Sequence, residues 1–249
     1  MDSVTVARSL RGSVGMLAMS WLMSDQTREQ AAARGMPLED NGAYAIGRLG
    51  VLGDCPVDNV VAAAYFWEPT LMRKMVQTGR AAMSPTEGAA VFADICRDHG
   101  TALLGDFEGT ERFGELMAAV VAAAEPHGAP TFVGWRDQPL PEEPGPARTF
   151  QLAQVMRELR FGRHAVAVQA SGMGPLEAIL AGPAGAWNAE FFGWPTPYPD
   201  VSHLSEAREE VEALTDRLHA RDLDVLSDEE RAELRSLAKA ARAHQKAKG

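Results

Sequence analysis

The sequence predicts an all-α protein, a multi-helix bundle, and three features of the chain carry this prediction. Strand patterns are nearly absent from the 249 residues, whereas apolar residues recur at the three- and four-residue spacing of one helix face. Alanine-rich runs are common, as in helical proteins. Helix start signals are clear, above all at residues 84–87, where serine caps the first turn, proline follows and glutamate closes a capping box.

Residues 1–125 are expected to form an N-terminal helical half. Its first 34 residues predict one or two helices, with Leu10, Leu17 and Trp21 on the apolar face and a break at Gly35. The helix that starts at Ser84 should end before Gly100, a residue type that often ends helices. The other expected helices cover residues 41–50, 58–65 and 110–124.

Residues 126–148 are expected to form a proline-rich connector, and residues 149–249 a C-terminal helical half. Six of the 15 prolines lie between residues 126 and 146, which predicts an extended path. Alternate prolines predict the same for residues 191–202. The expected helices of this half cover residues 149–170, 175–180, 205–219 and 227–243, the last with a capping box and a frayed end after it.

The bulk composition excludes several classes of protein. A net charge of −10 argues against a general binder of phosphate backbones, which needs a basic face. The two cysteines form neither a metal-ligand spacing nor a disulfide framework, which fits a reducing cytoplasm. No apolar run approaches the roughly 18 residues that span a bilayer. We therefore expect a cytoplasmic protein with no membrane segment, no metal and no cofactor.

Four stretches of the chain share their order and spacing with one known family. They are Gly47-Arg48-Leu49-Gly50-Val51-Leu52-Gly53, residues 60–69 ending in Tyr-Phe-Trp-Glu-Pro, Pro139-Leu140-Pro141, and residues 152–168. Through them the chain resembles, over about residues 10–237, an actinobacterial family of MarR-like winged-helix proteins of unknown function. The resemblance implies a winged-helix scaffold, pairing of two chains through their end helices, and regulation of transcription.

The chain departs from that family at two places. In an Arg-Glu-His-Arg-Gly-Asp-Gly-His-type run it keeps five residues but only one of the histidines, His164, and Gln151 stands where another histidine is usual. Where relatives continue with a recognition helix and a wing, residues 181–202 are rich in glycine and proline. We therefore expect a degenerate wing and no binding to DNA.

The long helix expected over residues 149–170 places three cationic groups on one flank. Arg157, Arg160 and His164 fall within roughly 60° of one another at about 100° per residue. Three interpretations remain open: a solvated face with partner carboxylates, a pocket for an anion, or a metal site at His164. In the anion pocket the arginines would clamp a carboxylate and His164 would donate or transfer a proton. No second histidine stands at a metal-ligand spacing.

The other candidates for the site come from several stretches of the chain. Tyr65 and Trp67 are candidates for an apolar wall, although aromatics at helical spacing more often belong to the core. Arg48 and Gln151 complete the ligand-binding candidates. His164 and Glu158 are the candidates for proton transfer.

The function that we expect is binding of an acidic or carboxylate-bearing small molecule, in specialised metabolism. One alternative is an enzyme that acts on a natural-product intermediate; another is a MarR-like transcription regulator, which would need a basic exposed helix. We also expect a homodimer, held by apolar stripes of the last two helices; the alternative is that these stripes pack within one chain. The stripes consist of Val211, Leu214, Leu218, Leu234 and Leu237.

Overall fold

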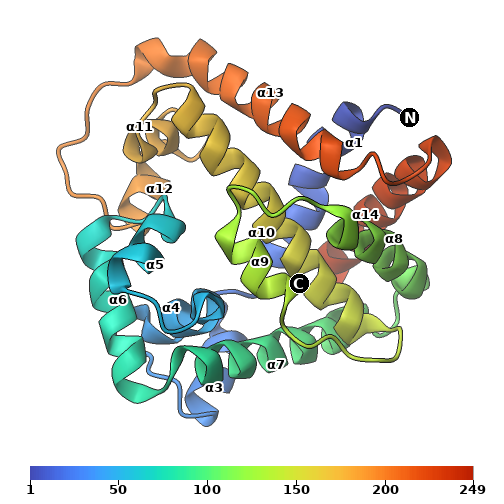
Figure 1. The fold of residues 1–249 in the computed structure, drawn as a ribbon, viewed down its shortest axis with the longest axis horizontal. Helices are drawn as coiled ribbons and strands as arrows, with labels where there is room; N and C mark the ends of the chain where they lie inside the picture. Colours follow the sequence, from blue (N-terminus) through green and yellow to red (C-terminus); the bar gives the residue numbers. More distant parts are fainter. Residues whose placement is uncertain (249) are drawn as a thin grey trace.

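All regular structure in the computed structural model, which describes residues 1–248, is helical, and no strand occurs among these residues (Figure 1). The all-α prediction is therefore confirmed. The α-helices are α1 (Ser3–Leu10), α2 (Met16–Met19), α3 (Asp25–Ala33), α4 (Gly42–Arg48), α5 (Val57–Ala64), α6 (Pro69–Ala82), α7 (Pro85–Leu104), α8 (Thr110–Ala123), α9 (Pro130–Arg136), α10 (Pro146–Ala170), α11 (Pro175–Leu180), α12 (Gly185–Phe191), α13 (Ser205–Asp222) and α14 (Asp228–Lys248). A π-helical turn (Arg11–Gly15) joins α1 to α2, and 3-10 turns occupy Glu39–Asn41, Gly50–Leu52 and Ser202–Leu204.

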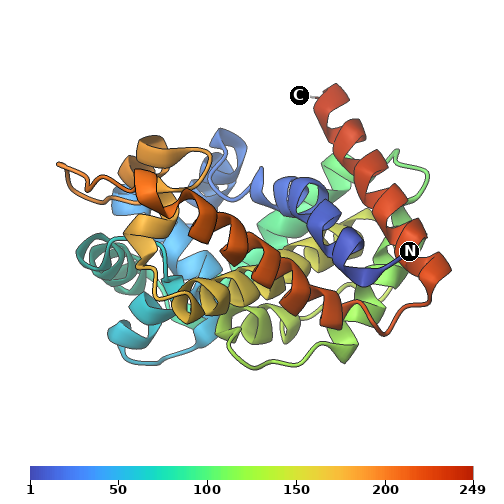
Figure 2. The same cartoon turned by 90° about the horizontal axis from the view of Figure 1, so that it is seen from above.

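The long helix α10 lies at the centre of the bundle and organises the other elements (Figures 1 and 2). It packs against α7, α8, α9 and α13. From the N-terminal part of the chain, the π-turn and α2 also contact it. Because it is covered on several sides, it buries polar residues as well as apolar ones, among them Gln151, Gln154, Glu158 and Arg163. Each of these buried polar groups needs a partner inside the protein.

Glycines set the closest helix contacts around α10. A Cβ on Gly100 would lie 2.3 Å from the Cβ of Phe150, so α7 and α10 can cross here only with glycine at this position. The expectation that Gly100 ends its helix is wrong, because α7 continues to Leu104. This glycine serves the packing of two helices and not a turn.

The Gly47-Arg48-Leu49-Gly50 stretch brings α4 against α7 in the same way. A Cβ on Gly47 would lie 2.4 Å from the ring of Phe92, and one on Gly50 would lie 2.4 Å from the carbonyl oxygen of Pro85. The close contact fixes the backbone of Arg48, which stands between these glycines. The side chain of Arg48 extends to Glu158 of α10. The stretch thus positions a buried arginine.

Several elements differ from the expectation, α9 and α6 among them. The connector is not extended throughout, because residues 130–136 form α9, with Phe132 and Trp135 fully buried. Pro130 stands in its first turn, where the missing N–H costs nothing. The helix α6 was not foreseen, although Pro69 follows Glu68, whose carboxylate accepts from the Leu71 amide at 2.7 Å.

The two terminal helices pack onto the same chain that forms them. The capping box at Ser227 and Glu230 is confirmed by reciprocal hydrogen bonds of 3.2 and 3.0 Å. Fraying was expected for residues 245–249, and for residues 245–248 this expectation is wrong, because α14 continues to Lys248. Val211 and Leu234, which belong to the apolar stripes of the last two helices, are buried inside the chain. The stripes therefore no longer support the homodimer, which stays a prediction.

The segment between α10 and α13 contains only short elements. The helix α12 has seven residues, and within residues 1–248 no strand follows it that could form a wing. None of the helices in this range is both long and apolar enough to cross a membrane.

Candidate functional site

A cavity of about 230 Å³ lies between the π-turn, α10 and α13. The three residues that the sequence placed on one flank of the long helix, Arg157, Arg160 and His164, all line it. The rest of its wall consists of Leu10, Arg11, Val14, Gly15, Met16, Met19, Met156, Phe161 and His219. The charged or titratable groups on this wall are therefore arginines and histidines, with no carboxylate among them.

The π-helical turn forms the outer wall of the cavity. The wider turn at Arg11–Gly15 interrupts the helix between Leu10 and Met16 and places Arg11 and Val14 against the cavity. Single π-turns inside helices occur often at functional sites. Met16 and Met19 are 39% and 47% exposed, so flexible thioether side chains border the opening.

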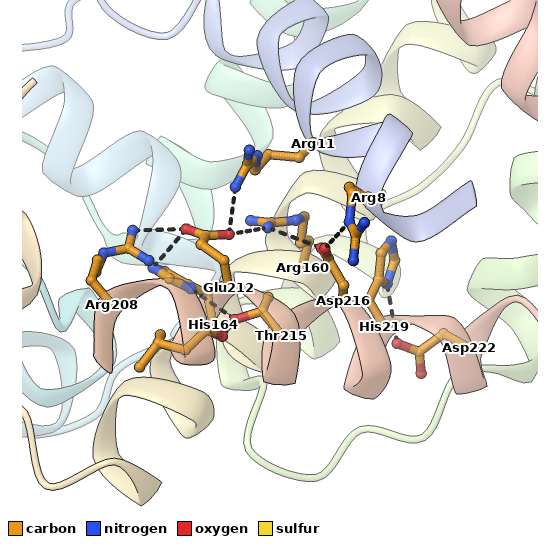
Figure 3. A network of polar contacts seen from close by, with 11 residues as sticks. Arg8, Arg11, Arg160, His164, Arg208, Glu212, Thr215, Asp216, His219 and Asp222 are labelled. Atoms are coloured by element: carbon orange, nitrogen blue, oxygen red, sulfur yellow. Dashed lines mark hydrogen bonds and ion pairs between the residues drawn. The ribbon is translucent and has the colours of Figure 1, made fainter. Parts of the chain in front are cut away.

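Three arginines from three elements converge on one carboxylate, that of Glu212 in α13 (Figure 3). Arg11 and Arg160 contact its Oε2 at 2.8 and 2.9 Å, and Arg208 contacts its Oε1 at 2.7 Å. Burial raises the pKa of Glu212, but the nearby His164, Arg160 and Arg208 outweigh burial and hold this pKa at about 2. Glu212 therefore remains ionised and acts as an internal counter-ion.

Asp216, one turn further along α13, shares one of these arginines, Arg160. Its Oδ2 accepts from the Nε of Arg8 at 3.2 Å, and its Oδ1 lies 3.7 Å from the NH2 group of Arg160. That Oδ1 and the Nε of Arg160 are both buried and have no hydrogen-bond partner within the part of the chain that the structure describes. Unsatisfied buried groups cost about 1–3 kcal/mol each, so these two atoms lower the stability of this part of the fold.

His164 is held in one orientation by α13 and by an aromatic ring. Its Nδ1 lies 2.9 Å from Oγ1 of Thr215, whose hydroxyl donates to the carbonyl oxygen of Val211 at 2.8 Å. Since that hydroxyl has only one proton, His164 donates through Nδ1, and its Nε2 carries the lone pair, 4.0 Å from Oε1 of Glu212. The ring also stacks on Phe66 at 5.5 Å.

The electrostatic surroundings keep His164 neutral near pH 7. Burial lowers its pKa most, the carboxylate of Glu212 acts in the opposite direction, and Arg208 and Arg160 lower it further. The resulting pKa is about 4. His164 can thus accept a hydrogen bond at Nε2 near neutral pH.

Glu158 does not line this cavity and is unsuited to the proton transfer that the sequence suggested for it. Its carboxylate is 0% exposed and accepts two hydrogen bonds of 2.8 Å from Arg48. Gln154 and Arg157 donate to its Oε1 at 2.8 and 2.7 Å. Burial raises the pKa of Glu158, but Arg48 and Arg157 more than compensate and hold it at about 2.

The buried pair of Arg48 and Glu158 supports the site from behind. Arg48 also donates to the hydroxyl of Tyr44 at 2.8 Å, and its guanidinium lies 4.8 Å from the ring centre of Phe161. Arg157 links the pair to the cavity, because it contacts Glu158 and also lines the wall. Arg48 is therefore a supporting residue rather than a ligand-contacting one.

Three further sequence-predicted residues lie away from this cavity. Trp67 is buried in an aromatic cluster with Tyr44 and Phe192. Gln151 is 0% exposed and donates to the carbonyl oxygen of Pro139 at 3.1 Å. Tyr65 lines a second, separate cavity. The first cavity thus uses Phe161 and methionines for its apolar wall.

Sequence reasoning missed the partners that the other elements supply. These are Arg11 on the π-turn, and Arg208, Glu212, Asp216 and His219 on α13. Arg208 and Glu212 stand at an i, i+4 spacing that predicts an ion pair on a helix, and this signal was available. That α10 and α13 meet at Arg160 depends on tertiary packing.

The net charge of the side chains around the cavity is positive, although the protein as a whole is acidic. Six guanidinium groups meet three carboxylates, whereas the net charge of the chain is −10. The side chains of Arg157, Arg160 and Arg208 are 17%, 15% and 13% exposed, so solvent screens them only in part. Such an arrangement favours an anion.

The site lies partly within a recognised family. Residues 7–197 match the model of a family described as the helix-turn-helix family, and this range contains Arg11, Arg157, Arg160 and His164 but not α13. No curated protein and no solved structure shows a significant match to the chain. Since the match covers well over half of the 249 residues, the chain belongs to this helix-turn-helix family.

Proposed function

We propose that this protein binds an acidic small molecule in the cavity between the π-turn, α10 and α13. One observation carries the proposal: every charged or titratable group on the cavity wall is an arginine or a histidine, and the other lining residues are apolar or glycine. Ligand sites in proteins combine such apolar walls with a few converging polar groups. Arginine is suited to carboxylates because its planar guanidinium donates two parallel hydrogen bonds.

In this proposal the acid group of the ligand lies against Arg160 and Arg157. Both arginines line the cavity, and Arg157 also donates to Glu158 through NH1. The carbon skeleton packs on Phe161 and the methionines at the opening, whose flexible side chains adapt to different shapes. His164, neutral near pH 7, accepts a hydrogen bond from a hydroxyl of the ligand.

The proposal is tested by calorimetry with 2-naphthoate, an aromatic carboxylate that serves as the probe. We expect Arg160→Met to weaken its binding about ten- to a hundredfold, the effect of losing a charged hydrogen bond of about 1.5–3 kcal/mol. Arg112→Met is the matched control, since Arg112 forms surface ion pairs with Glu233 and does not line the cavity. Unchanged binding by Arg160→Met would contradict the proposal.

DNA binding is the second candidate function, favoured by membership of the helix-turn-helix family. Against it, no lysine or arginine occurs between Arg163 and Arg208, a range that includes α11 and α12 and four acidic residues. A protein that reads DNA needs cations on the elements that contact phosphates. We therefore expect no salt-dependent binding of the protein to its own upstream DNA in a gel-shift assay. Nanomolar binding would instead support the alternative that the protein is a transcription regulator.

The compartment and the kind of organism are proposed from the resemblance to MarR-like proteins and from the cysteines. We propose a cytoplasmic protein of an actinobacterium, derived from a MarR-like scaffold, that acts in specialised metabolism. Cys55 and Cys96 are both free thiols, as expected in a reducing compartment.

A further inference from the structure

A second cavity of about 520 Å³ opens on another face of α10, between this helix, α5 and residues 128–130. Its wall is lined by Leu52, Cys55, Asn59, Ala62, Ala63, Tyr65, Gly128, Pro130, Phe161, Gly162, Ala165, Val166 and Gln169. No lysine, arginine, histidine, aspartate or glutamate belongs to this wall. The two cavities therefore differ in kind: the first is cationic and the second is uncharged.

Strained backbone directs an aromatic side chain into this second cavity. Tyr65 has φ 40° and ψ −54°, and the amide of Phe66 donates to the carbonyl oxygen of Ala64 at 2.6 Å. This is a γ-turn with positive φ, a rare and strained conformation, here adopted by a bulky residue. Strain of this kind persists where the surrounding structure enforces it, and it occurs preferentially at ligand sites.

The turn directs two adjacent rings to different surroundings. Tyr65 lines the second cavity, while Phe66 stacks on His164, which lines the first. Phe161 belongs to the walls of both cavities and stands between them. The uncharged cavity is thus a separate space, bounded on one side by the ring that also bounds the anion site.

We propose that this uncharged cavity is a second binding site, for a neutral ring-bearing small molecule, beyond the anion site proposed above. A charged ligand would lose hydration there without gaining a counter-charge. Tyr65 and Phe161 offer ring faces for stacking, and the alanines Ala62, Ala63 and Ala165 leave a slot beside them. The amides of Asn59 and Gln169 supply donors and acceptors for the polar substituents of such a ligand.

The chain contains its own reporter of this site. Cys55 lines the cavity and is half-buried, whereas Cys96 is 0% exposed. Burial also raises the pKa of the Cys96 thiol, which makes it unreactive. Alkylation by iodoacetamide therefore measures the accessibility of Cys55, and a molecule that occupies the cavity must slow it.

The experiment measures the alkylation rate of Cys55 by mass spectrometry, with 2-naphthalenemethanol as the neutral probe. We expect a saturating probe to slow alkylation at least fivefold in the wild type. Ala62→Phe, which fills the cavity from the exposed side of α5, should abolish this protection by the probe. Ala81→Phe, on an exposed position of α6 outside the cavity, is the matched control and should keep it.

Arg160→Met separates this inference from the anion site. Because Arg160 does not line the second cavity, this variant should retain full protection of Cys55 by 2-naphthalenemethanol, whatever its affinity for 2-naphthoate. Three results would each overturn the inference: no protection in the wild type, protection that persists in Ala62→Phe, or protection that is lost in Arg160→Met.

Discussion

Arg48 and Glu158, 110 residues apart in the sequence, form a buried ion pair with two nitrogen–oxygen distances of 2.8 Å. The pair joins α4 to α10 and fixes the part of α10 that carries the candidate site. Gln154 and Arg157 complete the hydrogen bonds of the carboxylate. The sequence indicated both Arg48 and Glu158 as site residues, but neither lines the first cavity, and both lie behind Arg157, which does.

Removal of one partner from this pair should destabilise the protein strongly. Arg48→Met leaves the charge of Glu158 buried without its main counter-charge, and we expect the free energy of unfolding to fall by about 3–5 kcal/mol. Urea denaturation measures this loss. Arg73→Met, in an exposed pair with Asp58, should change stability by no more than about 0.5 kcal/mol. A similar small effect of Arg48→Met would show that the pair is not structural.

Acid should destabilise the protein through His164. Its folded pKa of about 4 lies below the ordinary value of 6.5, so the unfolded chain takes up a proton that the folded chain does not. The free energy of unfolding should therefore decline as pH falls from about 6.5 to about 4. An NMR titration should give a midpoint near 4 for His164, and His164→Gln should flatten the decline. A midpoint at or above 6 would show that the ring is solvated.

Replacement of the internal counter-ion should strengthen ligand binding. Glu212→Gln releases Arg11, Arg160 and Arg208 from the carboxylate that they share, so more positive charge faces the cavity. If the proposed anion site is correct, 2-naphthoate should bind several-fold more tightly to this variant, as calorimetry would show. Glu209→Gln, at an exposed position of the same helix, is the control. Weaker binding to Glu212→Gln would mean that Glu212 orders the site rather than competes with the ligand.

The close contact between the 3-10 turn Gly50–Leu52 and α7 should not tolerate a methyl group. A Cβ on Gly50 would lie 2.4 Å from a backbone carbonyl oxygen of Pro85, which cannot move away as a side chain could. We expect Gly50→Ala to lower the free energy of unfolding by about 1–3 kcal/mol, the usual cost of overpacking. Gly12→Ala, where nothing lies within 4 Å of the new methyl group, should leave thermal stability nearly unchanged. Equal stability of the two variants would contradict the packing argument.

Local sequence signals predicted most helices of this fold, because they depend on neighbours along the chain. The serine caps at Ser84 and Ser227 and the periodic pattern of the long helix are examples. Packing roles were not predictable in this way: Gly100 resembles a helix end until Phe150 of another helix lies against it. Likewise, the proline-rich composition of residues 126–146 did not predict α9. The buried Trp135 of this helix donates to the Arg48 carbonyl oxygen.

The candidate site was predictable only on α10, the helix that supplies most of its charged or titratable groups. Helical geometry places Arg157, Arg160 and His164 on one flank, and these three residues line one cavity. The same geometry cannot show that Glu158 points away to Arg48, or that Glu212 of α13, 52 residues after Arg160, lies against that arginine. Such pairings depend on tertiary packing, which the spacing of residues along one helix does not encode.

The central claim is that an anion binds against the arginines of the first cavity, and a crystal structure with 6-bromo-2-naphthoate tests it most directly. Anomalous scattering locates the bromine without reference to the rest of the ligand. We expect one bromine peak in the cavity between the π-turn and α10, with the carboxylate within hydrogen-bond distance of Arg160 or Arg157. Bromine found only on the outer surface or in the uncharged cavity, with the first cavity filled by water, would contradict the account.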